Sequence, residues 1–208
     1  MDNIKGILEL FYFLSGPVIV FIALYGLKQL KISKDTNKLN AKRESFRLAG
    51  DQYAKFLEKI IPLVNELDKI VLEQNCKLMN SKIEIKDNSI ILDLDTSDLD
   101  IEKFRPLLEK ALHIANLMEG IAIFFTTGVA AEEVAYRSIG KTYCHCVKDL
   151  MPIILIGASS KHYENIIKLF FIWYNRIESE KLLIEKEKIG DRIKSLKNKK
   201  ITPLGLEE

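Results

Sequence analysis

The stretch from Ile7 to Leu27, ILELFYFLSGPVIVFIALYGL, decides how the rest of the chain is organised. It holds one charged residue, Glu9, near its start. As an α-helix at about 1.5 Å per residue this segment extends about 31 Å, and the hydrocarbon core of a bilayer is about 30 Å thick. The sequence therefore predicts one transmembrane helix over residues 7–27.

A signal peptide and a buried core helix both fit this apolar segment less well. A cleaved signal peptide has a basic N-terminal region and a small-residue cleavage site, and the flanking residues 2–5 and 26–29 provide neither. A buried core helix of this length ordinarily carries a polar stripe, which residues 7–27 lack.

Basic residues are distributed unevenly on the two sides of the predicted span. Lys5 precedes it, whereas six basic residues follow it closely: Lys28, Lys31, Lys34, Lys38, Lys42 and Arg43. Segments rich in Lys and Arg stay in the cytoplasm. The asymmetry therefore predicts that residues 1–6 lie outside the membrane and that everything after the span is cytoplasmic.

Small residues occur near the middle of the span. Pro17 has no N–H and removes one helix hydrogen bond, and the preceding residues are small enough for helices to approach closely. Both features are also common in inert anchors. The residues expected to line a pore or a contact between helices are Phe13, Ser15, Gly16 and Val20.

Residues 28–77 predict one long basic stalk helix with a heptad pattern. One apolar row recurs at every seventh position: Ile32, Leu39, Phe46, Tyr53, Ile60 and Leu67. A second row follows three residues behind in the later turns: Ala49, Phe56, Leu63 and Ile70. Asp35 and Lys42 take the second-row places earlier on, so the coiled-coil seam is thin there. Pro62 is expected to interrupt or bend this helix.

The remaining sequence predicts a cytoplasmic helical domain at 78–197 and a flexible tail at 198–208. Apolar and polar residues alternate on both sides of Asp87-Asn88, which predicts a β-hairpin within 82–95. The acidic residues that follow the hairpin fit a solvated loop and a helix cap at Thr96 or Ser97 better than a cation site.

Three helices are expected in this domain, at about 98–127, at about 131–150, and from about 160 into the charged run 178–200, where the helix is expected to fray. Gly128 is placed as the C-cap residue of the first, and Met151-Pro152 is expected to break the chain after the second. The predicted fold class is therefore mainly α: one N-terminal transmembrane helix that continues into a long stalk helix, then a helical bundle with a small β-hairpin.

Motifs that mark common enzymes and metal sites are missing from the sequence. It has no GxxxxGK[ST] loop, no GxSxG elbow, no HExxH and no paired CxxC motifs. Cys144 and Cys146 flank His145, but on a helix they point about 200° apart and cannot share a metal. We expect free thiols here and at Cys76, no metal, no cofactor and no catalytic residue, although a Glu119–His145 acid/base pair stays open.

Four short segments of the C-terminal half carry a resemblance to a known family. They are Asn116–Ala122 (NLMEGIA), Gly128–Val129, Ser138–Gly140 and Trp173–Arg176 (WYNR), placed behind an N-terminal span and a basic stalk. Together they resemble the bacterial DUF4760 family of single-span membrane proteins, and the layout is similar to that of Hailong-type membrane effectors of anti-phage defence. The likeness covers most of the chain, except the hairpin and the Cys144-His145-Cys146 segment.

The resemblance implies a function that the residue pattern alone does not. It implies a homotetrameric ion channel in the bacterial inner membrane, held shut by single-stranded DNA that a partner nucleotidyltransferase makes. The channel would open when phage nuclease removes the DNA. Opening would depolarise the cell, and the chain itself would not be an enzyme.

Elementary physics limits how such a channel is built. One helix cannot enclose a pore, so conduction needs several copies around an axis. The formal net charge of the whole chain is only +2, so phosphate binding needs local cations. The first candidate set is Lys38, Lys42, Arg43 and Arg47, repeated by symmetry. The alternative set, on a later helix, is Arg137, Lys141 and Lys148.

The sequence is also compatible with three simpler interpretations. The basic stalk is what a solvated helix attracted to anionic lipid looks like. A membrane-anchored oligomeric scaffold that recruits a cytoplasmic partner would have the same heptads and no conductance. A membrane-tethered hydrolase would lose its effect through one acidic or histidine substitution while its assembly is unaffected.

Overall fold

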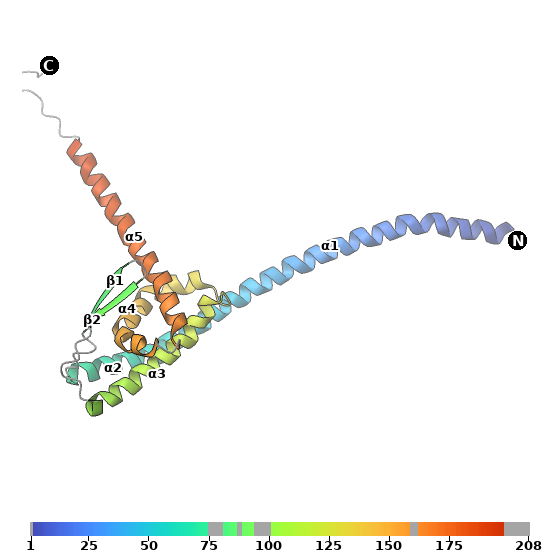
Figure 1. The fold of residues 1–208 in the computed structure, drawn as a ribbon. Coiled ribbons are helices and arrows are strands. Elements are labelled where there is room, and N and C mark those ends of the chain that lie inside the picture. The colour runs from blue at the N-terminus through green and yellow to red at the C-terminus, as the bar shows by residue number, and fades with distance from the viewer. Residues whose placement is uncertain (1, 75–80, 87–88, 94–100, 159–161, 198–208) are drawn as a thin grey trace, which may run out of the picture. The chain divides into compact units, whose positions relative to one another are not determined.

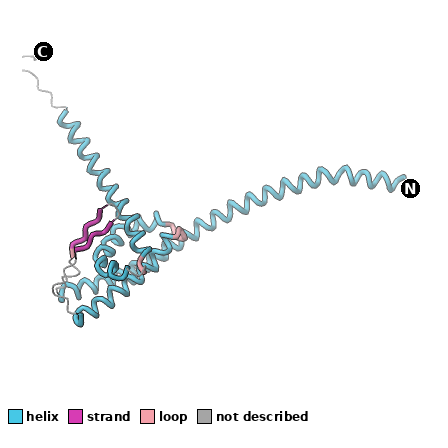
Figure 2. The backbone as a smooth tube through the Cα atoms, viewed as in Figure 1, coloured by secondary structure: helices cyan, strands magenta, loops and turns pink. Residues whose placement is uncertain are grey.

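The structure is a computed structural model that describes residues 2–74, 81–86, 89–93, 101–158 and 162–197 (Figure 1). It is mainly helical, with one small antiparallel hairpin (Figure 2), which confirms the predicted fold class. Cys76, the predicted caps Thr96 and Ser97 and the predicted tail lie outside the described residues.

The chain divides into two compact units, Met1–Arg47 and Leu48–Glu208. The first unit belongs to helix α1, Asp2–Lys55, which contains Pro17 without interruption. Side chains from Ser15 to Glu44 are all exposed in the single chain. Within the described residues, one helix is long and apolar enough to cross a membrane, and it lies near the N-terminus.

An irregular turn separates α1 from helix α2, Ile61–Gln74. Residues Phe56–Ile60 form a π-helical turn, η1, after which the Ile61 N–H donates to the Phe56 carbonyl oxygen. Pro62 follows at once and has no N–H to donate, so an ordinary α-helical bond cannot form there. The predicted interruption is therefore confirmed, but it starts at Phe56 and buries Phe56 and Ile60.

The hairpin consists of β1, Lys82–Lys86, and β2, Ser89–Asp93, within the predicted range. Ile83 pairs with Leu92 and Ile85 with Ile90, so the half-buried apolar residues share one face. Ile83, Ile85 and Ile90 pack against the hydrophobic core, as an isolated two-stranded sheet requires for stability.

Three long helices complete the second unit: α3 at Ile101–Thr126, α4 at Glu132–Ala158 and α5 at Glu164–Lys197. Gly128 ends the α3 region with a φ of 74°, a left-handed conformation that glycine adopts without strain, and the predicted cap is confirmed. The Ala130 N–H donates to the Phe124 carbonyl at 2.9 Å and closes the turn into α4.

The predicted break at Met151-Pro152 is wrong, because α4 continues through it to Ala158. A proline inside a helix costs about 3 kcal/mol. Met151, Ile153 and Ile154 are nearly inaccessible to solvent, and burying each such side chain contributes about 1.5–3 kcal/mol. The burial of these neighbours outweighs the lost hydrogen bond.

Aromatic side chains hold the helices of this unit together. The Trp173 ring of α5 lies 5.8 Å from Phe125 of α3 and 4.9 Å from Tyr143 of α4, between ring centroids. Tyr143 in turn lies 6.2 Å from Phe56 of η1. All of these rings are buried, so one continuous core joins η1, α3, α4 and α5.

Gly140 of α4 has no space for a side chain. A Cβ at this position would lie 2.6 Å from Cδ2 of the Tyr136 ring. We expect Gly140→Ala to lower the melting temperature of the detergent-purified protein by several degrees, because overpacking costs about 1–3 kcal/mol and 1 kcal/mol shifts a domain of this size by about 2–4 °C.

Gly120 of α3 offers the matched control. A Cβ there would have no neighbour within 4 Å, so Gly120→Ala should leave the melting temperature unchanged or raise it through better helix propensity. Equal melting temperatures for wild type and Gly140→Ala would contradict the close contact with Tyr136.

Candidate functional site

The segment Lys28–Arg47 of α1 is strongly basic. It carries seven Lys or Arg residues and two acidic residues, a local net charge of +5 in a chain whose total is +2. Its side chains are exposed, except that Ser45 is half-buried. This segment directly follows the apolar stretch, so positive charge is concentrated next to the only membrane-spanning candidate among the described residues.

The predicted cations of this segment differ in their surroundings. Arg47 Nη2 lies 2.6 Å from Glu44, and that hydrogen bond lowers the pKa of the Glu44 carboxyl. The ammonium group of Lys42 lies 5.6 Å from the centre of the Phe46 ring. Lys38 and Arg43 are exposed on the same helix. Lys38, Lys42 and Arg43 are therefore better placed for an outside anion than Arg47.

The heptad rows divide into two parts with different roles. Ala49, Phe56, Ile60 and Leu67 are buried in the core of the second unit. The predicted seam is therefore wrong in its later turns, because those residues pack within the same chain. The first row keeps exposures between 38% and 51% in its earlier turns: Ile32, Leu39, Phe46 and Tyr53. Only this part stays available to another helix.

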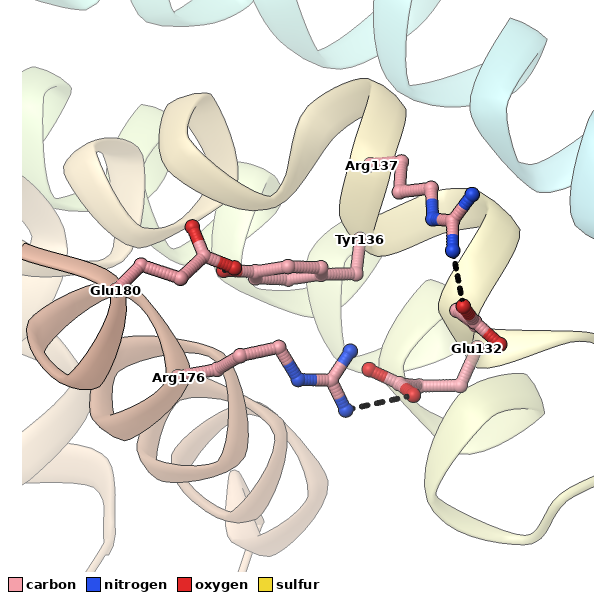
Figure 3. Close-up of a pocket in the computed structure, with 6 residues that line it drawn as sticks. Glu132, Tyr136, Arg137, Arg176 and Glu180 are labelled. Carbon is pink, nitrogen blue, oxygen red and sulfur yellow. Dashed lines mark hydrogen bonds and ion pairs between the residues drawn. The ribbon is translucent and has the colours of Figure 1, made fainter. Parts of the chain in front are cut away.

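A shallow pocket of about 350 Å³ lies between α4 and α5 (Figure 3). Six residues line it: Glu132, Glu133, Tyr136, Arg137, Arg176 and Glu180. Figure 3 shows the Arg176 side chain extending alongside the Tyr136 ring toward Glu132. The guanidinium carbon lies 4.4 Å from the ring centre, and Nη2 lies 3.2 Å from Glu132 Oε2.

The polar groups of this pocket are paired with one another. Glu132 also accepts a hydrogen bond from the Trp173 indole N–H, and the Tyr136 hydroxyl donates to Glu180 Oε1 at 2.7 Å. Burial, then the bond to Glu180, raises the pKa of Tyr136 to about 12, so the phenol stays protonated. The six lining residues include no Ser, Cys or His that could act as a nucleophile or base near neutral pH. The clearest role of this pocket is to tie α4 to α5.

The alternative set of cations lies on one side of α4, because Arg137, Lys141 and Lys148 are separated by four and seven residues. Arg137 bonds to Glu133 at 2.5 Å and lines the pocket between α4 and α5, beside its three glutamates. Lys148 places its ammonium group 4.6 Å from the centre of the Tyr174 ring. These neighbours make the α4 set a poorer phosphate site than the basic segment of α1.

The Cys144-His145-Cys146 segment places its side chains in different environments. The two thiols are buried, and burial raises the pKa of each to about 12. His145 is exposed and lies 3.6 Å from Asp149. Among the described residues, no group of three His, Cys, Asp or Glu side chains is arranged to hold a metal ion.

Glu119 of α3 has a role that sequence reasoning missed. Its carboxylate accepts hydrogen bonds from the Asn165 side chain at 2.7 Å and from the backbone N–H groups of Asn165 and Ile166 at 3.3 and 2.9 Å. It therefore caps the first turn of α5, which explains why that helix starts at Glu164. Glu119 and His145 have separate partners, so the structure gives no support to the acid/base pair that the sequence left open.

The buried thiols give a direct chemical test. In a Cys76→Ser background at pH 8, we expect Cys144 and Cys146 to react with a maleimide far more slowly than in the denatured chain, because the thiolate is the reactive form. Labelling followed by mass spectrometry measures both rates. Rapid modification of either cysteine in the folded protein would contradict its burial.

Comparisons of this chain with protein-family models, curated proteins and solved structures found no match. The function must therefore be inferred from the residues and geometry described above. The most distinctive arrangement is the apolar stretch of α1 followed by the basic, half-exposed heptad segment.

Proposed function

We propose that this protein is an oligomeric effector of the bacterial inner membrane that forms an ion channel and depolarises the cell. The observation that carries the proposal is α1, in which an apolar span and a basic segment with an exposed apolar row belong to one helix. The anti-phage role comes from the resemblance of four short segments to single-span membrane effectors. The N-terminus lies outside, and the second unit is cytoplasmic.

Assembly is the first requirement of this function. A single helix satisfies its backbone internally and leaves no channel, so the span must be repeated around an axis. Ile32, Leu39, Phe46 and Tyr53 supply an apolar row along which copies associate. The resemblance implies four copies. Within the membrane, Phe13, Ser15, Gly16 and Val20 line the pore or the contact between spans.

The position of Lys42 supports control by a polyanion. It occupies the second-row place of the heptad, so assembly along this row brings several Lys42 ammonium groups together. Lys38 and Arg43 flank the same row. Like charges this close repel unless an anion neutralises them. A single strand of DNA, made by a partner nucleotidyltransferase, is the polyanion that the resemblance implies.

A channel formed by the full chain would change the membrane potential. In cells induced to make the full chain, a voltage-sensitive dye should report depolarisation. A variant that lacks residues 1–27 should leave the potential unchanged, because it has no span. If neither changes the potential, the purified full chain should be tested for ion flux in liposomes stripped of nucleic acid. Silence there as well would favour the membrane-anchored scaffold.

A second prediction concerns the polyanion. A single-stranded oligonucleotide should reduce ion flux through the full chain in liposomes, and the triple variant Lys38→Glu, Lys42→Glu, Arg43→Glu should lose this response. Its binding should also depend less on salt, since each phosphate contact contributes about −0.7 to the slope of log affinity against log salt.

The matched control reverses the α4 set instead: Arg137→Glu, Lys141→Glu and Lys148→Glu. We expect this triple variant to respond to the oligonucleotide nearly as the wild type does, because Arg137 already lies among carboxylates. If only the α4 variant loses the response, the phosphate site lies on α4 and the assignment to α1 is wrong.

A further inference from the structure

The C-terminal half of α5 has an apolar row that the described part of the chain does not cover. Every side chain from Ser179 to Ile189 is exposed, and α5 continues as a single helix to Lys197 (Figure 1). Six large apolar side chains of this half have exposures between 48% and 64%, and all but Leu183 and Ile184 share one side of the helix: Leu182, Ile189, Ile193 and Leu196. We call these four residues the α5 stripe.

The α5 stripe lies on the opposite side of the helix from the bundle core. At about 100° per residue, Leu182 is about 180° around the helix from Trp173, and the other three members lie within about 40° of Leu182. The side that continues from Trp173 holds Ile184 but otherwise turns polar, at Glu180 and Asp191. The stripe is therefore not an extension of the face that packs within the chain.

Spacing and charge indicate what covers the stripe. The intervals of seven, four and three residues are those of a coiled-coil row. Residues 178–188 carry four acidic and three basic groups, whereas residues 189–197 carry one acidic and three basic groups. Two such helices in antiparallel orientation place the acidic half of each against the basic half of the other. A parallel pair would set like against like.

We propose that the α5 stripe pairs with the α5 stripe of a second copy of this chain, in antiparallel orientation about a two-fold axis near Ile189. Such an interface is isologous, so one patch serves both copies. Glu185 and Arg192 flank the stripe on the same side, so Glu185 of one copy lies toward Arg192 of the other. The contact adds to the α1 assembly and suits an even number of copies, and it does not require that the span conducts ions.

Cysteine cross-linking in native membranes tests both the pairing and its direction. Ser179 and Lys197 fall beside the two ends of the stripe by helical position and leave its apolar residues intact. The full chain, in a Cys76→Ser background, is made in two tagged forms, one with Ser179→Cys and one with Lys197→Cys. A short bismaleimide should join the two forms to each other severalfold more than it joins two Ser179→Cys chains.

A matched pair of substitutions then tests which side of α5 forms the contact. Ile189 in the stripe and Ile184 on the core side are both 53% exposed. Ile189→Glu should lower the cross-linked fraction severalfold, and Ile184→Glu should leave it unchanged. Dominant Ser179→Cys self-linking would overturn the antiparallel direction. Absence of any link, or equal loss with both isoleucine variants, would overturn the pairing.

Charge reversal at Glu185 and Arg192 tests whether these side chains attract one another across the interface. Glu185→Lys should reduce cross-linking, and adding Arg192→Glu to the same chain should restore it. Failure of this rescue would overturn the charge complementarity. Ion flux measured in the same membranes reports on the channel proposal separately, because cross-linking and conductance fail independently.

Discussion

Burial of the Trp173 indole is the interaction on which the second unit depends. The ring touches aromatic side chains of α3 and α4, and Tyr143 extends the contact to Phe56 in η1. Its N–H donates to Glu132, so the one polar atom of the ring is also satisfied. The same bond places Glu132 beside Arg176 and creates the wall of the pocket in Figure 3. Glu132 therefore links the buried Trp173 of the core to Arg176 of the pocket.

The core of the second unit also determines which heptad residues stay exposed to solvent. Along α1, η1 and α2 the heptad spacing does not change, yet Ile32, Leu39 and Phe46 are exposed. Phe56, Ile60 and Leu67 are buried. Residues 28–47 contribute no side chain to the hydrophobic core and carry a net charge of +5. Because like charges repel, copies of this apolar row associate weakly unless an anion neutralises the surrounding Lys and Arg side chains. In the proposed mechanism, assembly is therefore coupled to an anionic ligand.

The polar groups of the second unit serve structure more than chemistry. Glu119 caps α5, Tyr136 and Arg176 stack between α4 and α5, and the thiols of Cys144 and Cys146 lie in apolar surroundings. Burial raises the pKa of both thiols and of Tyr136, so these groups stay protonated near neutral pH. Large apolar side chains stay exposed on α1 and on the C-terminal half of α5, and these are where the proposed activity and assembly are placed.

The sequence by itself determined the apolar segment, the basic stretch, the hairpin and the Gly128 cap that follows α3, because each depends on local composition or on one residue's backbone preference. It misassigned Pro152, whose cost is local but whose compensation comes from neighbours buried by other helices. It also missed Glu119, whose partners Asn165 and Ile166 are more than forty residues away. Only the tertiary structure decided which heptad residues face the core and which face outward, because a repeat of seven specifies one side of a helix and not the partner that covers it.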